Sequence, residues 1–116
     1  MSPARKAPTP QDELLKGTLD MLILQVLAVR SLHGYAIVQQ IERLSSGVFS
    51  VEQGTLYPAL QRLQKQGLLT AKWGLSPTGR KARYYTITAA GRRRLGEQVS
   101  SFERVLAAIK AVMSGA

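Results

Sequence analysis

Residues 35–66 read YAIVQQIERLSSGVFSVEQGTLYPALQRLQKQ, and this stretch decides the fold. Its apolar residues recur three and four positions apart on both sides of a short turn at residues 45–51, which predicts helices over about 35–45 and 52–66. The inward positions are Ile37, Val38, Ile41 and Leu44 before the turn and Leu56, Ala59, Leu60 and Leu63 after it. Gly67 then ends the second helix as a cap. Pro58 removes one backbone hydrogen bond, so we expect this helix to begin later than residue 52 unless its first turn is irregular. Two helices joined in this way form a helix-turn-helix.

The flanking segments extend this motif on both sides. A first helix is expected over about 11–30, apolar around much of its circumference and therefore buried on several sides. Strands are expected over 69–73 and 83–88, joined by a long basic loop at 74–82, and Thr88 is a suitable N-cap for a last helix that runs to about Met113. The expected fold is mainly α with a small β-hairpin: a winged helix-turn-helix plus long N- and C-terminal helices. Its parts are a disordered arm at 1–10, which contains three prolines, a DNA-binding domain at 11–88 and a C-terminal helix at 89–116.

Composition excludes several classes of function. The 116 residues contain no cysteine and one histidine, and the seven carboxylates have no metal-ligand spacing, so we expect no disulfide, metal, cofactor or catalytic activity. His33, which precedes a Gly-Tyr turn, is expected to make a structural hydrogen bond. No signal peptide is visible, and the longest apolar run, 19–29, is shorter than the roughly 20 residues of a membrane span, so the cytoplasm is expected and no membrane partner.

The distribution of charge is the first indication of a partner. The chain has 16 basic and seven acidic residues, for a net charge of +9. No acidic residue occurs between Glu52 and Glu97, and that interval contains Arg62, Lys65, Lys72, Arg80, Lys81, Arg83, Arg92, Arg93 and Arg94. A basic block beside a neutral remainder favours a face that binds a polyanion, although a merely solvated basic face would have the same composition.

The second helix of the motif has an outer face suited to base edges. Its outward residues are Gln53, Thr55, Tyr57, Pro58, Gln61, Arg62 and Lys65. Gln side chains can bond adenine, Arg can bond guanine or a phosphate, and the proline ring can touch a thymine methyl. An ordinary solvated face would look similar, but the basic run at 79–83 that follows favours double-stranded DNA as the partner.

In these motifs and their order, the chain resembles the PadR family. The shared runs, in family order over about residues 14–95, are LKGTLD at 15–20, LHGY at 32–35, GTLYPAL at 54–60, RL at 62–63, GL at 67–68, GRK at 79–81, RYY at 83–85 and ITAAG at 87–91. The resemblance implies a winged-helix homodimer, usually a repressor. It places Thr55, Tyr57 and Pro58 near the DNA-facing start of the recognition helix. Phosphate contacts are implied for Tyr35, Arg80, Lys81 and Arg83, and Lys16 of the first run is included among the expected DNA contacts.

The last helix carries a stripe that predicts dimerisation. Leu95, Val99, Phe102, Leu106, Ile109 and Met113 follow the alternating spacing of four and three that is typical of a coiled-coil seam. A second copy would cover this stripe, with the first helix as second contributor, and two-fold symmetry would then favour a roughly palindromic operator. The alternative is that the stripe folds back onto its own domain. With Phe102 as its only aromatic residue, this helix favours a small ligand, a protein partner or no effector over a flat aromatic drug.

Three other functions stay open at this level. The same basic block would serve a sequence-neutral architectural DNA-binding protein, and some winged helices bind proteins. Single-strand binding would need exposed aromatic rings, and we expect Trp73, Tyr84 and Tyr85 to pack within the wing instead.

Overall fold

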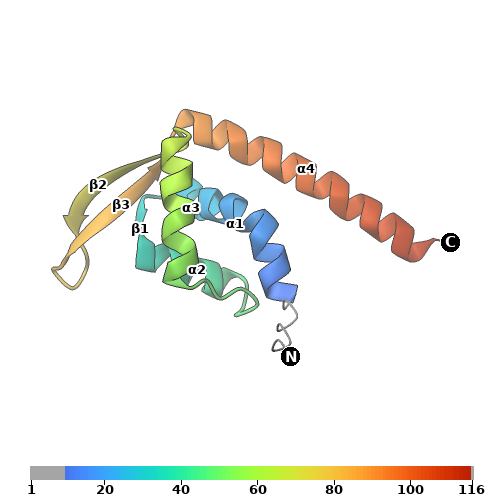
Figure 1. The fold of residues 1–116 in the computed structure, drawn as a ribbon, viewed down its shortest axis with the longest axis horizontal. Coiled ribbons are helices and arrows are strands. Elements are labelled where there is room, and N and C mark those ends of the chain that lie inside the picture. Colours follow the sequence, from blue (N-terminus) through green and yellow to red (C-terminus); the bar gives the residue numbers. More distant parts are fainter. Residues whose placement is uncertain (1–9, 116) are drawn as a thin grey trace, which may run out of the picture.

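The computed structural model describes residues 10–115, with side chains from residue 18 onward. Its elements in chain order are α1 (Pro10–Val29), β1 (Leu32–His33), α2 (Gly34–Leu44), α3 (Gln53–Lys65), β2 (Leu69–Leu75), β3 (Lys81–Ile87) and α4 (Ala89–Ser114). The winged helix-turn-helix predicted from the sequence is therefore confirmed, and Figure 1 shows the wing, β2 and β3, at the opposite end of the molecule from the end of α4. Residues 1–9 of the expected arm lie outside the described part, and Pro10 is the first residue of α1.

The helix-turn-helix packs on α1 and on the base of the wing. Side chains of α1, α2, α3, β2 and β3 form one apolar core, and its most completely buried members are Ile23, Leu24, Leu27, Ile37, Leu56, Leu60, Leu63 and Leu69. The inward stripe of α3 is thus confirmed. Burial of each such side chain contributes on the order of 2 kcal/mol, so this core fixes how α3 sits relative to the wing.

One predicted core position is wrong. Leu44 is 63% exposed, because it is the last residue of α2 and the chain turns away at Ser46, whose φ is 52°. Val29, the last residue of α1, is 78% exposed as well. These two side chains border a shallow apolar pocket of about 240 Å³ between the ends of α1 and α2.

The sheet has three strands in the order β1-β3-β2, all antiparallel. The third strand, β1, was not predicted, since two residues are too few for a periodic pattern. Its residues Leu32 and His33 pair with Tyr85 and Tyr84 of β3. The hairpin strands are also longer than expected, so the loop between them is residues 76–80 and not 74–82.

Helix boundaries follow local capping chemistry. α3 begins at Gln53, one residue after the expected position 52, and continues through Pro58, so Pro58 does not delay the start of the helix any further. Gly67 follows α3 with a φ of 75°, a conformation that glycine adopts without strain. Thr88 caps α4 as expected: its Oγ1 accepts a hydrogen bond from the Gly91 amide at 3.0 Å and donates one to the Gly67 carbonyl at 2.7 Å. Among the described residues, no helix is long and apolar enough to cross a membrane.

Candidate nucleic-acid interface

The outer face of α3 is exposed over its whole length. Leu56, Ala59, Leu60 and Leu63 hold the helix on the core, and every predicted contact residue on it is exposed, namely Gln53, Thr55, Tyr57, Pro58 and Arg62. The helix therefore presents polar side chains from its first turn onward without covering them. A helix held in this way has the shape that a DNA major groove admits.

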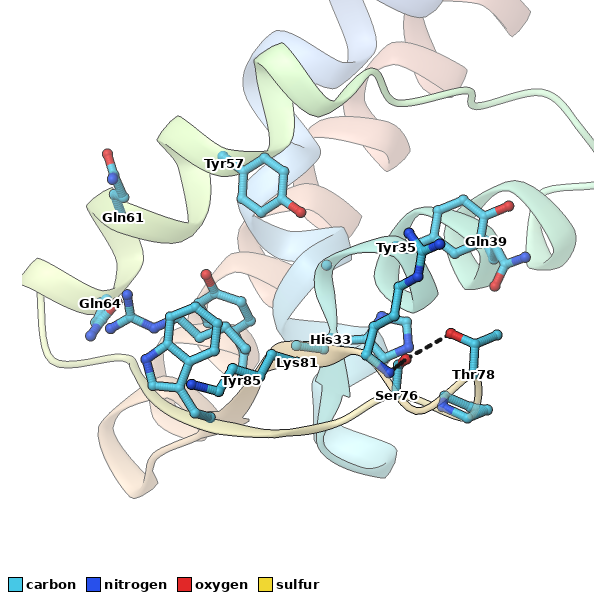
Figure 2. Close-up of a pocket in the computed structure, with 16 residues that line it drawn as sticks. His33, Tyr35, Gln39, Tyr57, Gln61, Gln64, Ser76, Thr78, Lys81 and Tyr85 are labelled. Carbon is cyan, nitrogen blue, oxygen red and sulfur yellow. Dashed lines mark hydrogen bonds between the residues drawn. The ribbon is translucent and has the colours of Figure 1, made fainter.

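A groove of about 850 Å³ separates α2 and α3 from the wing. It brings together five of the predicted contact residues, Tyr35, Tyr57, Arg80, Lys81 and Arg83, and its remaining lining includes no aspartate or glutamate. Figure 2 shows Tyr57 and Gln61 on the α3 side of this groove, and Lys81 on the wing side. Gln53, Thr55 and Pro58 lie on α3 outside the groove. The groove therefore combines three cations with aromatic and amide side chains, and its charge suits an anionic strand.

The tyrosines of the groove are positioned by the start of α2. The Tyr57 ring packs so closely on Gly34 that a Cβ atom there would lie 2.9 Å from its hydroxyl oxygen. His33 caps α2, because its Nδ1 accepts a hydrogen bond from the Ala36 amide at 3.2 Å, and its ring makes an edge contact with Tyr84 at 5.4 Å. The expected structural role of His33 is thus confirmed. Tyr35, the next residue after Gly34, is exposed at the helix start.

The tip of the wing is a short, internally bonded turn. The Ser76 amide donates to the Arg80 carbonyl at 2.8 Å, and the Gly79 amide donates to the Ser76 carbonyl at 2.9 Å. The Ser76 hydroxyl also accepts from the Arg80 amide at 3.2 Å. Gly79 has a φ of 81°, which favours glycine at this position. Of the predicted wing cations only Arg80 lies in the turn, while Lys81 and Arg83 lie on β3 and share one face of it.

Arg62 is engaged away from the groove. Its guanidinium Nη2 lies 2.5 Å from Oδ1 of Asp20 on α1, an ion pair with both side chains partly exposed. Arg62 would have to leave this pair to contact a base, so its predicted role stays a prediction. Lys16 lies within α1, and its side chain is outside the described residues.

The aromatic residues of the wing behave in two ways. Tyr84 and Tyr85 pack as expected: the Tyr84 hydroxyl donates to the Leu75 carbonyl at 2.6 Å, and Tyr85 is buried, which raises the pKa of its hydroxyl. The expected packing of Trp73 is wrong, since its side chain is 67% exposed on the groove side of β2. Its ring contacts the guanidinium of Arg83, whose Cζ lies 5.9 Å from the ring centroid.

The predicted seam on α4 is exposed over most of its length. Leu95 and Val99 are half-buried near the body of the protein, and Leu95 packs against the core. Beyond them Phe102, Leu106, Ile109 and Met113 are exposed, as are Val105 and Val112. Figure 1 shows this part of α4 running away from the rest of the chain, so the stripe does not fold back onto its own domain.

Sequence reasoning missed part of the groove lining. Gln39, Gln64 and Trp73 line it, and none of them was among the predicted contacts. The alternation of side chains along β2 could have identified Trp73. Trp73 lies on the same face of the strand as the buried Leu69, but four residues farther along, where the core has ended. Among the side chains that the structure describes, no group of acidic or histidine residues could hold a metal ion.

A helix-turn-helix followed by a two-stranded wing, with a basic groove between them, defines a winged-helix protein of the DNA-binding class. Residues 23–97 match the family described as the transcriptional regulator PadR-like family. The chain therefore belongs to the PadR-like family of transcriptional regulators, which implies DNA binding.

Comparison with known proteins agrees with this assignment. The chain is 33% identical over 93 residues to a transcriptional regulator of Mycobacterium tuberculosis, a match that covers 80% of this chain and 83% of that protein. It is 33% identical over 100 residues to the transcriptional regulator YqjI of Escherichia coli, a match that covers 86% of this chain but only 46% of that protein. The crystal structure of a PadR-like transcriptional regulator from Bacillus cereus is similar with a TM-score of 0.77 and 29% identity, over 90% of this chain and 99% of that one.

Proposed function

We propose that this protein is a sequence-specific repressor that binds a roughly palindromic operator as a homodimer. The observation that carries the proposal is the exposed α3 beside a groove with three cations and no acidic lining residue. In this arrangement α3 enters the major groove and reads base edges through Gln53, Thr55 and Tyr57. The wing cations bind phosphates and fix the register of the helix.

The homodimer is supported by the exposed stripe on α4. A single chain leaves Phe102, Leu106, Ile109 and Met113 in water, a continuous apolar surface that a second copy of the same helix can cover. Two-fold pairing would present two copies of α3 about one turn of DNA apart, so that each half of a palindrome meets one protomer. Repression is the usual role implied by the resemblance to the PadR family, and a dimer bound across a promoter would act in this way by excluding RNA polymerase. A regulator of this kind acts where the chromosome lies, so we infer the cytoplasm as its location, and it needs no catalytic activity.

The test is selection of bound sequences from a random duplex pool, followed by competition. A two-fold symmetric consensus that resists a large excess of random duplex supports the proposal, and repression is then checked by a reporter that carries the consensus between promoter and gene. Binding that the random duplex displaces equally well would instead support the sequence-neutral architectural protein. Failure to bind any duplex, together with an association with another protein that persists after nuclease treatment, would instead point to a protein partner.

A further inference from the structure

We propose that the groove between α3 and the wing holds one sugar-phosphate strand of duplex DNA, with Trp73 as its apolar contact and as the residue that positions Arg83. This inference rests on the proposed function, since it names how the wing holds the DNA that α3 reads. It assigns a DNA-binding role to Trp73, which the charge pattern of the chain does not predict and which was expected to pack within the wing.

The exposure of Trp73 needs an explanation. It is the only tryptophan in the chain, and 67% of its surface is exposed on the concave side of the wing. Leu75, on the same face of β2, is 68% exposed as well, but it is not among the residues that line the groove, so Trp73 is the apolar residue of β2 that faces it. Exposed large apolar side chains that line a concave surface are typical of binding sites, because a ligand removes them from water.

The register of the wing pairs Trp73 with a cation. Trp73 lies directly opposite Arg83 in the β2–β3 ladder, and the guanidinium lies over the indole ring at 5.9 Å. Such a contact is worth more when it is removed from water, and it limits the number of rotamers available to a long side chain. Arg83 is therefore held on the groove side before any ligand binds, and less conformational entropy is lost when it meets a phosphate.

The lining of the groove selects a sugar-phosphate strand. Arg80, Lys81 and Arg83 supply positive charge, the lining contains no carboxylate, and Trp73 supplies an apolar surface between them. A nucleic-acid strand alternates anionic phosphates with less polar sugars, so the cations would meet phosphates while the indole meets a deoxyribose. On the other side of the protein's groove, the exposed face of α3 is suited to the major groove of DNA. Only a duplex has a major groove, so the occupant is a duplex and not a single strand.

Trp73 fluorescence tests the inference directly, because no other residue contributes a tryptophan signal. The full-length protein is titrated with a short random-sequence duplex that carries a dye, so that dye anisotropy reports binding and tryptophan emission reports the groove. We expect the emission to change in proportion to the anisotropy, and bound DNA to protect the indole from acrylamide quenching. Anisotropy that saturates while emission and quenching stay constant would overturn the inference and leave DNA binding intact. Absence of any anisotropy change, with the selected duplex as well, would overturn the proposed function itself.

A double-mutant cycle separates positioning from mere packing. Trp73→Ala is expected to weaken binding to random and selected duplexes equally, on the order of tenfold, while Trp73→Phe retains most of the affinity. In the Arg83→Ala background the same Trp73→Ala change should cost less than in the parent protein, because the cation that it positions is gone. Thr70→Ala, an exposed residue on the opposite face of β2, is the matched control and should bind like the parent.

The thermal unfolding midpoint of each variant distinguishes binding from folding. Trp73 is largely exposed, so its loss should leave the midpoint close to that of the parent. Unchanged binding by Trp73→Ala, or an equal loss in both backgrounds, would contradict the positioning role. Tighter binding of a single strand than of a duplex would contradict the proposed occupant.

Discussion

Nη2 of Arg62 on α3 lies 2.5 Å from Oδ1 of Asp20 on α1, so the recognition helix is tied by an ion pair to the helix beneath it. The sequence places Arg62 on the outer face of α3 and favours DNA contact. In the structure the guanidinium instead turns toward α1, and α1 also packs against α4. The pair thus connects the DNA-facing helix to the part of the protein that we propose to dimerise.

Loss of Asp20 is expected to strengthen DNA binding. Asp20→Ala removes a carboxylate near α3 and frees Arg62 to meet a phosphate, so affinity for any duplex should rise. The pair is partly exposed, and its coupling energy for folding, measured by a double-mutant cycle with Arg62→Ala, should stay below about 1 kcal/mol. Glu97→Ala, which removes an exposed carboxylate on α4, is the control for net charge. An equal gain in affinity from both variants would show that Arg62 is not the cause.

Wing cations should act on affinity and not on specificity. Arg80→Ala or Lys81→Ala should weaken binding to all duplexes about equally, and each should flatten the log–log salt dependence by about one unit. The parent slope should be near −7 if the dimer neutralises on the order of 8 phosphates. Arg104→Ala removes an exposed cation from α4 and is the matched control. A parent slope shallower than about −2 would contradict the electrostatic footprint.

Thr55 tests base reading by α3. Thr55→Ala should cost roughly 1–3 kcal/mol of binding free energy on the selected operator and less on random duplex. Gln66→Ala, at an exposed position just past the end of α3, should change neither. Equal losses on operator and random duplex would favour the sequence-neutral architectural protein.

Charge in the α4 stripe should prevent dimerisation. Phe102→Glu combined with Leu106→Glu should give monomers in sedimentation velocity and abolish operator binding, because each protomer would bury two carboxylates in the interface. Ser100→Glu with Ala111→Glu adds the same charge to the opposite face of α4 and should leave the oligomeric state unchanged. A parent protein that is monomeric at micromolar concentration would show that the stripe has another partner.

Two glycines of α4 should respond in opposite directions to the same change. A methyl group at Gly91 would overlap the Leu68 carbonyl oxygen and lie 2.7 Å from Ile87 Cγ1, and the backbone there cannot easily move. Gly91→Ala should therefore destabilise the fold by about 1–3 kcal/mol. Gly96 has open space around it, and Gly96→Ala should stabilise the helix by about 0.5–1 kcal/mol. Denaturant unfolding of both variants measures the difference, and equal effects would show that α4 does not pack on Leu68 as described.

The periodic parts of the fold were predictable from the sequence. The structure agrees with the stripe of α3, with the stripe of α2 apart from Leu44, with the cap at Thr88 and with the left-handed position at Gly67, each of which follows from local residue chemistry. All the α3 residues expected to contact DNA are exposed, because residues opposite a buried stripe must face outward.

The features that escaped prediction depend on contacts between distant segments. β1 exists only because residues 32–33 reach β3, some fifty residues later in the chain. The Arg62–Asp20 pair joins two helices that no local pattern relates. As a large aromatic residue in a strand, Trp73 was expected to pack within the wing. It is exposed in the groove because the core ends before this position, and the sequence does not show where the core ends. Spacing along the chain carries none of this information.

The two-sided pairing of β3 has a mechanical consequence. A hairpin that is connected to the domain only through its two ends could rotate about its base. Here β3 is hydrogen-bonded to β1 on one edge and to β2 on the other, which opposes that rotation. Since β1 leads directly into α2, we expect the wing and the helix-turn-helix to move together. In the proposed dimer, release of DNA would then come from rotation of whole protomers about the α4 contact, with no hinge inside either protomer. The amides at the centre of β3 should accordingly be among the slowest in the wing to exchange with solvent deuterium.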